Sequence, residues 1–215
     1  MIVTLDGPAG SGKSTTARAL AKKLGALYLD TGAMYRAVTL KAIQGGVEPT
    51  DRERLEKISS EISIDFRETN DDQLVLVDGV DRTLDIRRPE VEKAVSAVSS
   101  HAGVRERMVA LQRKIASSHP KVVVEGRDTG SVVFPNADYK FYLSASPEVR
   151  AARRGRQNEE RGTKSGDVIG EINKRDAMDS GRAVSPLVVP PGGVELDNSN
   201  LSLDETIQKI IDSLV

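Results

Sequence analysis

Eight residues near the amino terminus constrain the fold more than any other part of this sequence. They run from Gly7 to Ser14 and match the pattern G-x-x-x-x-G-K-[ST]. A short β-branched run, Ile2 to Leu5, precedes them, and a helix-forming run, Ser14 to Leu24, follows them. In this order the glycines let successive backbone N–H groups converge on a phosphate, and the helix adds its positive end. The segment therefore predicts a phosphate-binding loop between a strand and a helix.

The loop also predicts the side chains that would serve ATP and its metal ion. Lys13 would reach the β- and γ-phosphates, and the Ser14 hydroxyl would join the shell of a Mg²⁺ ion. Mg²⁺ is therefore the expected cofactor, with ATP as co-substrate. The expected ATP-binding residues are Gly7, Pro8, Ala9, Gly10, Ser11, Gly12, Lys13, Ser14 and Thr15.

Short apolar runs alternate with helical patterns along most of the chain, which predicts an α/β fold with a parallel sheet. The fully apolar run Val122 to Val124 is the best candidate for an interior strand. Thr50 and Glu53 form a capping-box pattern that opens a helix to about Ser60. Further strands are expected at 27–29, 141–143 and 194–196, and further helices at 33–44, 89–99, 104–117, 146–160, 167–179 and from 202 onward.

The pattern changes between about Ile62 and Thr83. Apolar and polar residues alternate from Ile62 to Phe66, and the polar turn Asn70-Asp71-Asp72 separates them from a second apolar run. This segment predicts a small antiparallel insert. A second polar segment, Arg161 to Gly166, is expected to form a loop tip between two helices.

Composition narrows the classes of partner. The chain has 215 residues and a net charge of -1, which argues against broad nucleic-acid binding and favours one or two phosphorylated small molecules. It has no cysteine, so it cannot form a disulfide framework or a thiolate metal site. No signal peptide or long apolar run is evident, which argues against secretion and membrane insertion. We therefore expect a cytoplasmic monomer without nucleic-acid or membrane partners.

The phosphate loop alone leaves several functions open, since kinases, motor ATPases and GTPase switches share it. The guanine-reading pattern N-K-x-D occurs at Asn173 to Asp176, and D-x-x-G occurs at Asp167 to Gly170. Both fall in one helical pattern, whereas GTPases place them far apart at strand ends, so we interpret both as chance matches. Net ATP hydrolysis that needs no acceptor would favour a nucleotide-dependent switch.

Clustered polar side chains are expected at the ends of several strands and helices. In an open parallel sheet, ligands bind beyond the carboxyl ends of the strands, where Thr31 and Asp128 should lie. Gly126 is expected to permit a tight turn that exposes Arg127 and Asp128 at the sheet edge. The segments concerned are Asp30 to Arg36, Ser96 with Arg105, Glu125 to Asp128, and Arg175 to Arg182.

With these segments the chain resembles the bacterial cytidylate kinase family over nearly its whole length. The motifs D-T-G-A-M-Y-R, E-G-R-D-x-G-S-V-V-F-P and R-D-x-x-D-S-x-R-A-x-S-P-L occur in order, beginning at residues 30, 125 and 175. The resemblance implies a phosphate-loop fold with five parallel strands flanked by helices, a small antiparallel insert for the nucleoside monophosphate, and a short arginine-bearing lid. One domain is expected, with a core of residues 1–60, 100–150 and 167–215, an insert of about 61–99, and a lid of about 151–166.

The resemblance also implies the reaction, which is transfer of the γ-phosphoryl group of ATP to CMP and dCMP. A close rival is a kinase of the same fold that acts on UMP, dTMP or another small acceptor. The residues of the acceptor site follow from matching motif positions. Arg36, Arg127 and Arg182 would hold the acceptor phosphate; Ser96, Arg105 and Asp128 would read the cytosine; Arg175 and Asp179 would contact the ribose; Thr31 and Tyr35 would line the pocket; and Arg153, Arg154 and Arg156 would belong to the lid.

These assignments agree with the chemistry of the side chains. Arginine forks match phosphate oxygens, and a carboxylate such as Asp128 can accept from the cytosine amino group. An anionic acceptor needs no general base, so Lys13 and the arginines at 36, 127 and 182 would act by positioning and by spreading charge.

Overall fold

The computed structural model describes residues 1–69, 73–160, 167–182 and 184–214. It divides into two compact units. The first contains Met1–Leu29 and Ala116–Val215, and the second contains Asp30–Ile115. No helix among the described residues is long and apolar enough to cross a membrane.

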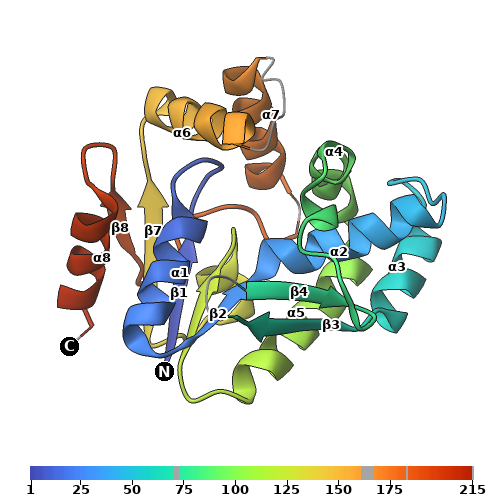
Figure 1. The fold of residues 1–215 in the computed structure, drawn as a ribbon, viewed down its shortest axis with the longest axis horizontal. Coiled ribbons are helices and arrows are strands. Elements are labelled where there is room, and N and C mark those ends of the chain that lie inside the picture. The colour runs from blue at the N-terminus through green and yellow to red at the C-terminus, as the bar shows by residue number, and fades with distance from the viewer. Residues whose placement is uncertain (70–72, 161–166, 183, 215) are drawn as a thin grey trace. The chain divides into compact units, whose positions relative to one another are not determined.

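The first unit is built on a parallel five-stranded sheet with strand order β2-β6-β1-β7-β8 (Figure 1). The strand Val122–Glu125 is fully buried and lies between two neighbours, which confirms the predicted interior strand. Since the sheet is parallel, the carboxyl ends of all its strands lie on the same side of the sheet. The strands are β1 (Ile2–Asp6), β2 (Leu27–Asp30), β6 (Val122–Glu125), β7 (Tyr139–Ser144) and β8 (Val194–Asp197).

Two helices cover one face of this sheet. Apolar side chains of α1 (Lys13–Leu24) and α8 (Leu203–Asp212) join a single core cluster with those of β1 and β7. Gly12 and Gly25 bound α1 in the left-handed conformation, which glycine adopts without strain. The capping box predicted at Ser202 is present, with its hydroxyl accepting from the backbone N–H of Glu205.

Two further helices, α6 (Pro147–Glu160) and α7 (Val168–Ser180), pack on each other (Figure 1). Pro147 occupies the first helical position of α6, as predicted, because its fixed φ suits a helix start. The loop tip expected at 161–166 lies outside the described residues. The N-K-x-D match lies inside α7 and the aspartate of the D-x-x-G match caps its start, so both belong to one helix.

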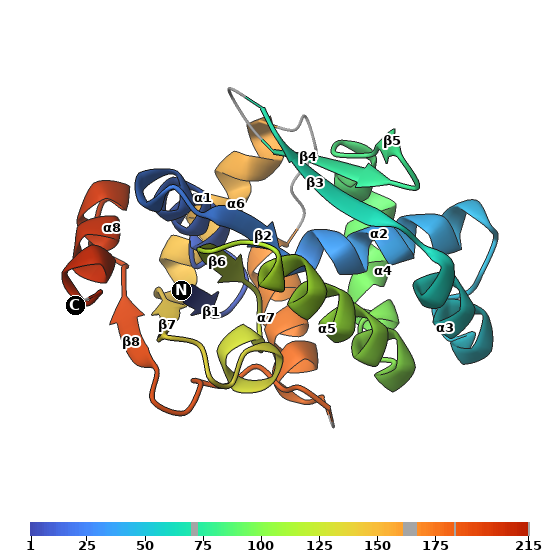
Figure 2. The ribbon, with the colours of Figure 1, turned by 90° about the horizontal axis from the view of Figure 1, so that it is seen from below.

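The second unit combines helices with a small antiparallel sheet, which Figure 2 shows as β3, β4 and β5 side by side. The predicted insert is therefore present as a three-stranded sheet, although the turn expected at 70–72 lies outside the described residues. The elements are α2 (Thr31–Gln44), α3 (Arg52–Glu61), β3 (Ile64–Glu68), β4 (Gln73–Val77), β5 (Val80–Asp81), the short 3-10 helix η1 (Asp85–Arg87), α4 (Pro89–Val98) and α5 (Ala102–Ser117).

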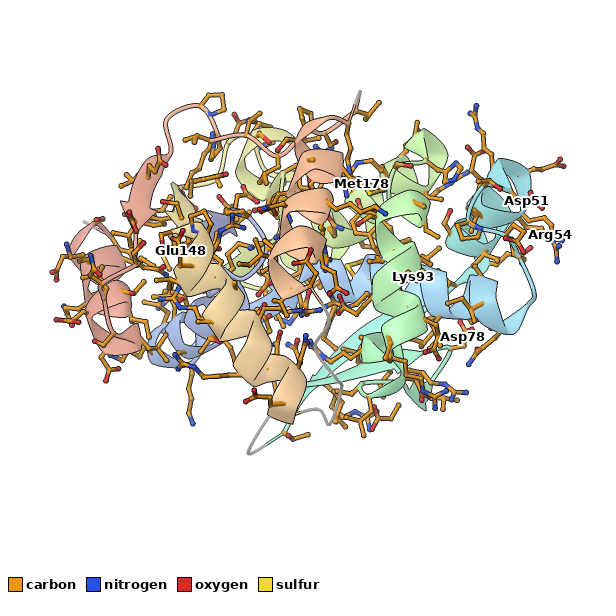
Figure 3. All side chains as sticks on the ribbon, turned by 90° about the horizontal axis from the view of Figure 1, so that it is seen from above. Asp51, Arg54, Asp78, Lys93, Glu148 and Met178 are labelled. Atoms are coloured by element: carbon orange, nitrogen blue, oxygen red, sulfur yellow. The ribbon has the colours of Figure 1, made fainter. Side chains whose placement is uncertain are left out.

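The start of α3 differs from its prediction by one residue. Asp51, and not Thr50, is the N-cap, and its carboxylate accepts from the backbone N–H of Arg54 at 3.1 Å (Figure 3). Both residue types cap helices, but the Asp51 carboxylate is an anion at the positive end of the helix. The predicted pairing of Thr50 with Glu53 is therefore wrong, although the helix exists at the predicted place.

The fold class predicted from the sequence is confirmed by the parallel sheet, its flanking helices and the small antiparallel sheet. The boundaries expected for the core, the insert and the lid stay a prediction.

Candidate functional site

The loop from Gly7 to Ser14 joins β1 to α1, as the sequence predicts. Gly7, Gly10 and Gly12 adopt φ values of 145°, 76° and 89°, which side chains rarely tolerate. Space is limiting as well. A Cβ atom on Gly7 would lie 2.1 Å from the Leu143 carbonyl oxygen, and one on Gly10 would lie 2.8 Å from the Arg150 carbonyl oxygen. Each of these two glycines is therefore required by its φ value and by a close neighbour.

Carbonyl oxygens of the loop accept hydrogen bonds from cationic side chains. Lys13 Nζ donates to the Pro8 oxygen at 2.6 Å, within the loop itself. The other donors come from distant parts of the chain, so the conformation of the loop depends on them. They are Arg127 to the Gly7 oxygen at 2.9 Å, Arg150 to the Ala9 oxygen at 3.0 Å, and Arg153 to the Ser11 oxygen at 3.3 Å, where the Asn198 amide also donates at 2.9 Å.

Lys13 is 5% exposed. Burial and then the neighbouring charge of Arg127 lower its pKa well below the usual range, while the carboxylates of Glu125 and Asp176 act in the opposite direction. The ammonium is thus disfavoured by its surroundings. A polyphosphate at the loop would supply the negative charge that stabilises it, so Lys13 is poised to gain from binding such an anion.

Glu125 lies at the end of β6, in a segment whose polar side chains the sequence predicts to cluster without predicting a role for Glu125 itself. Its carboxylate accepts from the Ser14 hydroxyl at 2.8 Å and from the Tyr28 hydroxyl at 2.8 Å. It is 7% exposed, so it is a buried carboxylate beside the residue expected to bind metal. The available signal was an acidic residue directly after an apolar interior strand.

A buried carboxylate links two of the predicted arginines. Asp179 is 2% exposed, accepts from Arg127 Nε at 2.8 Å, and forms a close ion pair with Arg182. Burial acts to raise the pKa of Asp179, but the charges of Arg127 and Arg182 outweigh it, so the net shift is downward. Arg127 is therefore brought to Asp179 and Arg182 across 52 positions of sequence, and it joins them to the loop through Gly7.

Arg175 adds a weaker contribution to the same charge balance, because its positive charge also lowers the pKa of Asp179. It lies on α7, one turn before Asp179. Arg175 and Asp179 therefore lie on the last turns of α7, and Arg182 follows just after the helix end.

Asp128 is buried, with 5% of its surface exposed, so the prediction that the turn exposes it is wrong. Gly126 is not among the described glycines with positive φ, and the chain passes at once into a short π-helix, Thr129–Val133. Asp6 holds the start of that helix, accepting from the Thr129 backbone and hydroxyl at 2.8 Å each and from the Gly130 N–H at 2.7 Å. Asp6 therefore fixes the backbone directly after Asp128.

The second unit contains five predicted acceptor residues, all buried: Thr31, Tyr35, Arg36, Ser96 and Arg105. Asp30 caps α2 by accepting from the Ala33 N–H at 2.8 Å, and it also accepts from Arg36 at 2.9 Å. Arg87 approaches the same carboxylate at 3.5 Å. Two cations are therefore gathered on one buried anion.

Tyr35 and Arg105 are also brought together, because the guanidinium of Arg105 lies 5.2 Å from the centre of the Tyr35 ring. Arg105 donates to the Ser99 carbonyl oxygen at 3.2 Å, which fixes its orientation. Thr31 opens α2 and Ser96 lies on α4.

The three arginines expected in the lid have different surroundings. Arg153 donates to the Asn198 side chain at 2.9 Å and to its carbonyl oxygen at 3.0 Å, beside the phosphate loop. Burial and the charge of Arg156 lower the pKa of Arg153. Arg154 donates to Gln157 at 2.8 Å, and Arg156 is exposed.

Comparison with known proteins gives consistent matches. The family model described as cytidylate kinase matches residues 3–215. A cytidylate kinase of Nocardia farcinica (strain IFM 10152) is 46% identical over 212 residues, covering 98% of this chain and 91% of the relative. That of Caldanaerobacter subterraneus subsp. tengcongensis is 44% identical, with coverages of 99% and 93%. That of Enterococcus faecalis is 45% identical, with coverages of 97% and 92%.

Solved structures share the fold at low sequence identity. TT1252 from Thermus thermophilus aligns with a TM-score of 0.51 and 19% identity, covering 100% of this chain and 98% of that one. Shikimate kinase from Bacteroides thetaiotaomicron aligns with a TM-score of 0.50 and 12% identity, with the same coverages. At these identities the likeness concerns the fold alone.

Proposed function

Because the chain belongs to the cytidylate kinase family, we propose that it transfers the γ-phosphoryl group of ATP to CMP and dCMP, giving ADP and CDP or dCDP. The observation that carries this proposal is the position of Arg127. It donates to the phosphate loop at Gly7 and to Asp179, which also pairs with Arg182. A second group of cations beside a phosphate loop suits an acceptor phosphate, whereas a switch that only binds and hydrolyses nucleotide does not need one.

The residues of the first unit have the following proposed roles. Gly7 to Thr15 bind the ATP phosphates, with Lys13 at the β- and γ-phosphates. Arg127 and Arg182 hold the acceptor phosphate, and Asp128 reads the cytosine amino group. Arg175 and Asp179 contact the ribose, and Arg153, Arg154 and Arg156 belong to the lid.

In the second unit, Arg36 is proposed to bind the acceptor phosphate, while Ser96 and Arg105 read the base. Thr31 and Tyr35 line the acceptor pocket. We further propose the domain division of the sequence analysis, with a core of 1–60, 100–150 and 167–215, a nucleotide-binding insert of about 61–99 and a lid of about 151–166. A monomer acting in the cytoplasm completes the proposal.

The proposed transfer is an in-line displacement in which the acceptor phosphate oxygen attacks the γ-phosphorus. That oxygen is already anionic, so catalysis rests on holding two mutually repelling anions together and spreading their charge. Lys13 and the arginines of the site supply that positive charge. Exclusion of water would prevent simple ATP hydrolysis.

Mg²⁺ fits the oxygen donors beside the loop. Among the described residues, no group of three or more His, Cys, Asp and Glu side chains is arranged so that it could hold a metal ion, and we propose that Mg²⁺ is held by few protein ligands and by phosphate oxygens. Ser14 is the proposed ligand, and Glu125 is hydrogen-bonded to it. Bound Mg²⁺ would neutralise charge on the transferred phosphoryl group.

Glu125→Gln is expected to raise the Mg²⁺ concentration needed for half-maximal activity by about tenfold or more, as for partners that orient metal ligands. An amide still bonds to one hydroxyl but carries no charge toward the cation. The measurement is a Mg²⁺ titration of activity at fixed ATP. The control is Glu195→Gln, which removes an exposed carboxylate on β8. An unchanged Mg²⁺ requirement in the Glu125 variant would contradict the proposed role of Glu125 beside the metal ligand Ser14.

A coupled assay of ADP release across CMP, dCMP, UMP, dTMP and AMP tests the proposed function. CMP and dCMP should stimulate ADP release far more than the other acceptors. Preference for UMP or dTMP would instead identify the close rival. ADP release that is independent of every acceptor would favour the nucleotide-dependent switch.

Discrimination between CMP and UMP is expected to depend on Asp128. Its carboxylate can accept from the cytosine amino group, but it would face the lone pairs of uracil O4 in a buried setting. Such a mismatch costs about 1–3 kcal/mol, which corresponds to about tenfold to a few hundredfold preference for CMP. Ser96 and Arg105, as donors to cytosine N3 or O2, would oppose uracil N3–H and add to it.

Asp128→Asn is therefore expected to narrow the ratio of kcat/KM values for CMP and UMP, chiefly by lowering that for CMP. The amide can rotate to offer a donor or an acceptor, so it distinguishes the bases poorly. The measurement compares both acceptors in the variant, in the parent and in the exposed control Asp204→Asn. Undiminished discrimination in the Asp128 variant would mean that another residue reads the base.

A further inference from the structure

The Ala9 peptide groups of the phosphate loop are held from two sides. The Ala9 N–H donates to Asp176 Oδ1 at 2.8 Å, and the Ala9 carbonyl oxygen accepts from Arg150 at 3.0 Å. Arg150 and Asp176 also form a close ion pair with each other. One loop residue, one residue of α6 and one of α7 therefore close a ring of polar contacts.

Arg150 is the buried member of this ring, while Ala9 and Asp176 are partly exposed. Arg150 is 8% exposed, and its backbone packs so closely on Gly10 that a Cβ atom there would lie 2.8 Å from the Arg150 oxygen. An ion pair that is withdrawn from water gains when its donors and acceptors also bond to neighbouring groups, and here Arg150 Nη1 and Asp176 Oδ1 both bond to the backbone of Ala9. The arrangement is therefore specific to one loop conformation.

The geometry of the peptide bond gives this arrangement a consequence for anion binding. In a trans peptide the C=O and the next N–H point in opposite directions. Since Arg150 holds the Ala9 oxygen, the N–H of Gly10 points away from Arg150. The same reasoning applies at Ser11, whose oxygen is held by Arg153 and Asn198, and to the N–H of Gly12 that follows. Because the Ala9 and Ser11 carbonyl oxygens are hydrogen-bonded to these side chains, the N–H groups of Gly10 and Gly12 are directed to the opposite side, where a phosphate would bind.

We propose that Arg150 and Asp176 are positioning residues that hold the phosphate loop in its anion-binding conformation by fixing both peptide groups of Ala9. In this role Ala9 does not donate its own N–H to the anion, because that N–H donates to the Asp176 carboxylate. Its contribution is to hold the neighbouring peptide groups in place. The inference rests on the proposed function only in taking the loop as the site of the ATP phosphates.

The proposal and simple electrostatics predict opposite effects of removing Asp176 on the affinity for phosphate. Asp176 is an anion close to a site for anions, and by charge alone its removal should strengthen phosphate binding. If Asp176 instead orients the loop, its removal weakens binding. Asparagine tests the difference because its side chain has one accepting oxygen and one donating NH2 group. If the oxygen accepts from the Ala9 N–H, the NH2 group faces the Arg150 guanidinium, and if the oxygen accepts from Arg150, the NH2 group faces the Ala9 N–H. In either orientation one donor lies against another.

The experiment measures the dissociation constant of inorganic tripolyphosphate by calorimetry at fixed ionic strength. The variants are Asp176→Asn, Arg150→Met and the double variant, with Glu171→Gln as the control, an exposed carboxylate in the first turn of α7. Each single variant should weaken binding by about tenfold to a hundredfold, the range for hydrogen bonds to charged groups. The double variant should lose no more than either single one, because both act through one ring.

Arg150→Lys guards against loss of folding. Lysine keeps the charge, but its shorter side chain does not carry the ammonium to the position of Arg150 Nη1, the atom that donates to both Asp176 and the Ala9 oxygen, so an intermediate loss is expected. The kcat/KM values for ATP should rank the variants in the same order as the tripolyphosphate dissociation constants. The dissociation constant of CMP, measured without ATP, should stay within about twofold of the parent value, since CMP is proposed to bind outside the phosphate loop.

Unchanged or tighter tripolyphosphate binding in Asp176→Asn would overturn the proposal, and so would additive losses in the double variant. Weaker binding with the expected non-additivity would support it. A parent enzyme that binds neither tripolyphosphate nor ATP would refute the proposed function itself, which is a separate outcome.

Discussion

Replacing Lys13 with alanine is expected to lower kcat by about a hundredfold to a thousandfold, as for loss of a single charge-stabilising group in other active sites. The Lys13 ammonium is the loop's own cation, and the surroundings disfavour its charge until a polyphosphate arrives. Its contribution is therefore realised with bound ATP and in the transition state. The measurement is steady-state kcat at saturating ATP and CMP.

The same substitution should leave the folded protein as stable as the parent, or more stable. Burial lowers the pKa of Lys13, so its charging opposes folding. This penalty is fully present below the folded-state pKa and disappears above the unfolded-state value, so thermal unfolding at neutral pH reveals it. Lys23→Ala, in the last turn of α1, is the matched control. A folded Lys13 variant with near-normal turnover would refute the loop assignment.

Replacing Arg127 with alanine is expected to reduce kcat/KM for CMP by about a hundredfold or more, since Arg127 is the proposed fork on the acceptor phosphate. ATP binding should weaken by less than about tenfold, because the variant loses one hydrogen bond to the Gly7 oxygen while the other loop contacts stay. Kinetics with each substrate varied in turn separates the two effects.

Arg127→Ala should also change how stability depends on pH. Arg127 and Arg182 outweigh burial and depress the pKa of Asp179, so their pairing adds stability above the unfolded-state pKa, and this stability is lost as the pH falls through the folded-state pKa. The variant should therefore be less stable than the parent near neutral pH, by about 1–3 kcal/mol, with the difference shrinking in acid. Denaturant unfolding between acid and neutral pH measures it.

Arg107→Ala, an exposed arginine on α5, controls for the loss of one positive charge. Equal loss of CMP and ATP binding in the Arg127 variant would place Arg127 on the donor nucleotide instead. A stability difference that does not vary with pH would mean that Asp179 does not depend on Arg127 for its charge.

Local rules identified most of the architecture. The phosphate loop was predictable because its glycines, lysine and serine must occur at fixed spacing between a strand and a helix. The interior strand Val122–Glu125 was predictable because a continuous apolar run suits a strand covered on both faces. The start of α3 was missed by one residue, because Thr50 and Asp51 are both competent caps and sequence alone does not rank adjacent ones.

The missed parts of the site depend on contacts between residues far apart in the chain. Asp128 is buried just before a π-helix whose first residues are bonded to Asp6, more than a hundred positions earlier in the chain. The contact of Glu125 with the Ser14 hydroxyl depends on the pairing of β6 with β1, which joins strands more than a hundred residues apart. Arg150 meets Ala9 across 141 positions of sequence. No periodicity or motif spacing reports such pairings.

The hold of Asn198 on the Ser11 carbonyl oxygen joins two positions separated by 187 residues. On a ribosome, the loop is therefore synthesised well before Asn198 and receives this support only after Asn198 has emerged. The strand β8 that precedes Asn198 pairs with β7 and closes one edge of the sheet at the same stage. A nascent chain that ends before Asn198 has the complete phosphate-loop motif and lacks one of its supports, so the proposed ATP site gains its full set of contacts only after Asn198 has been synthesised.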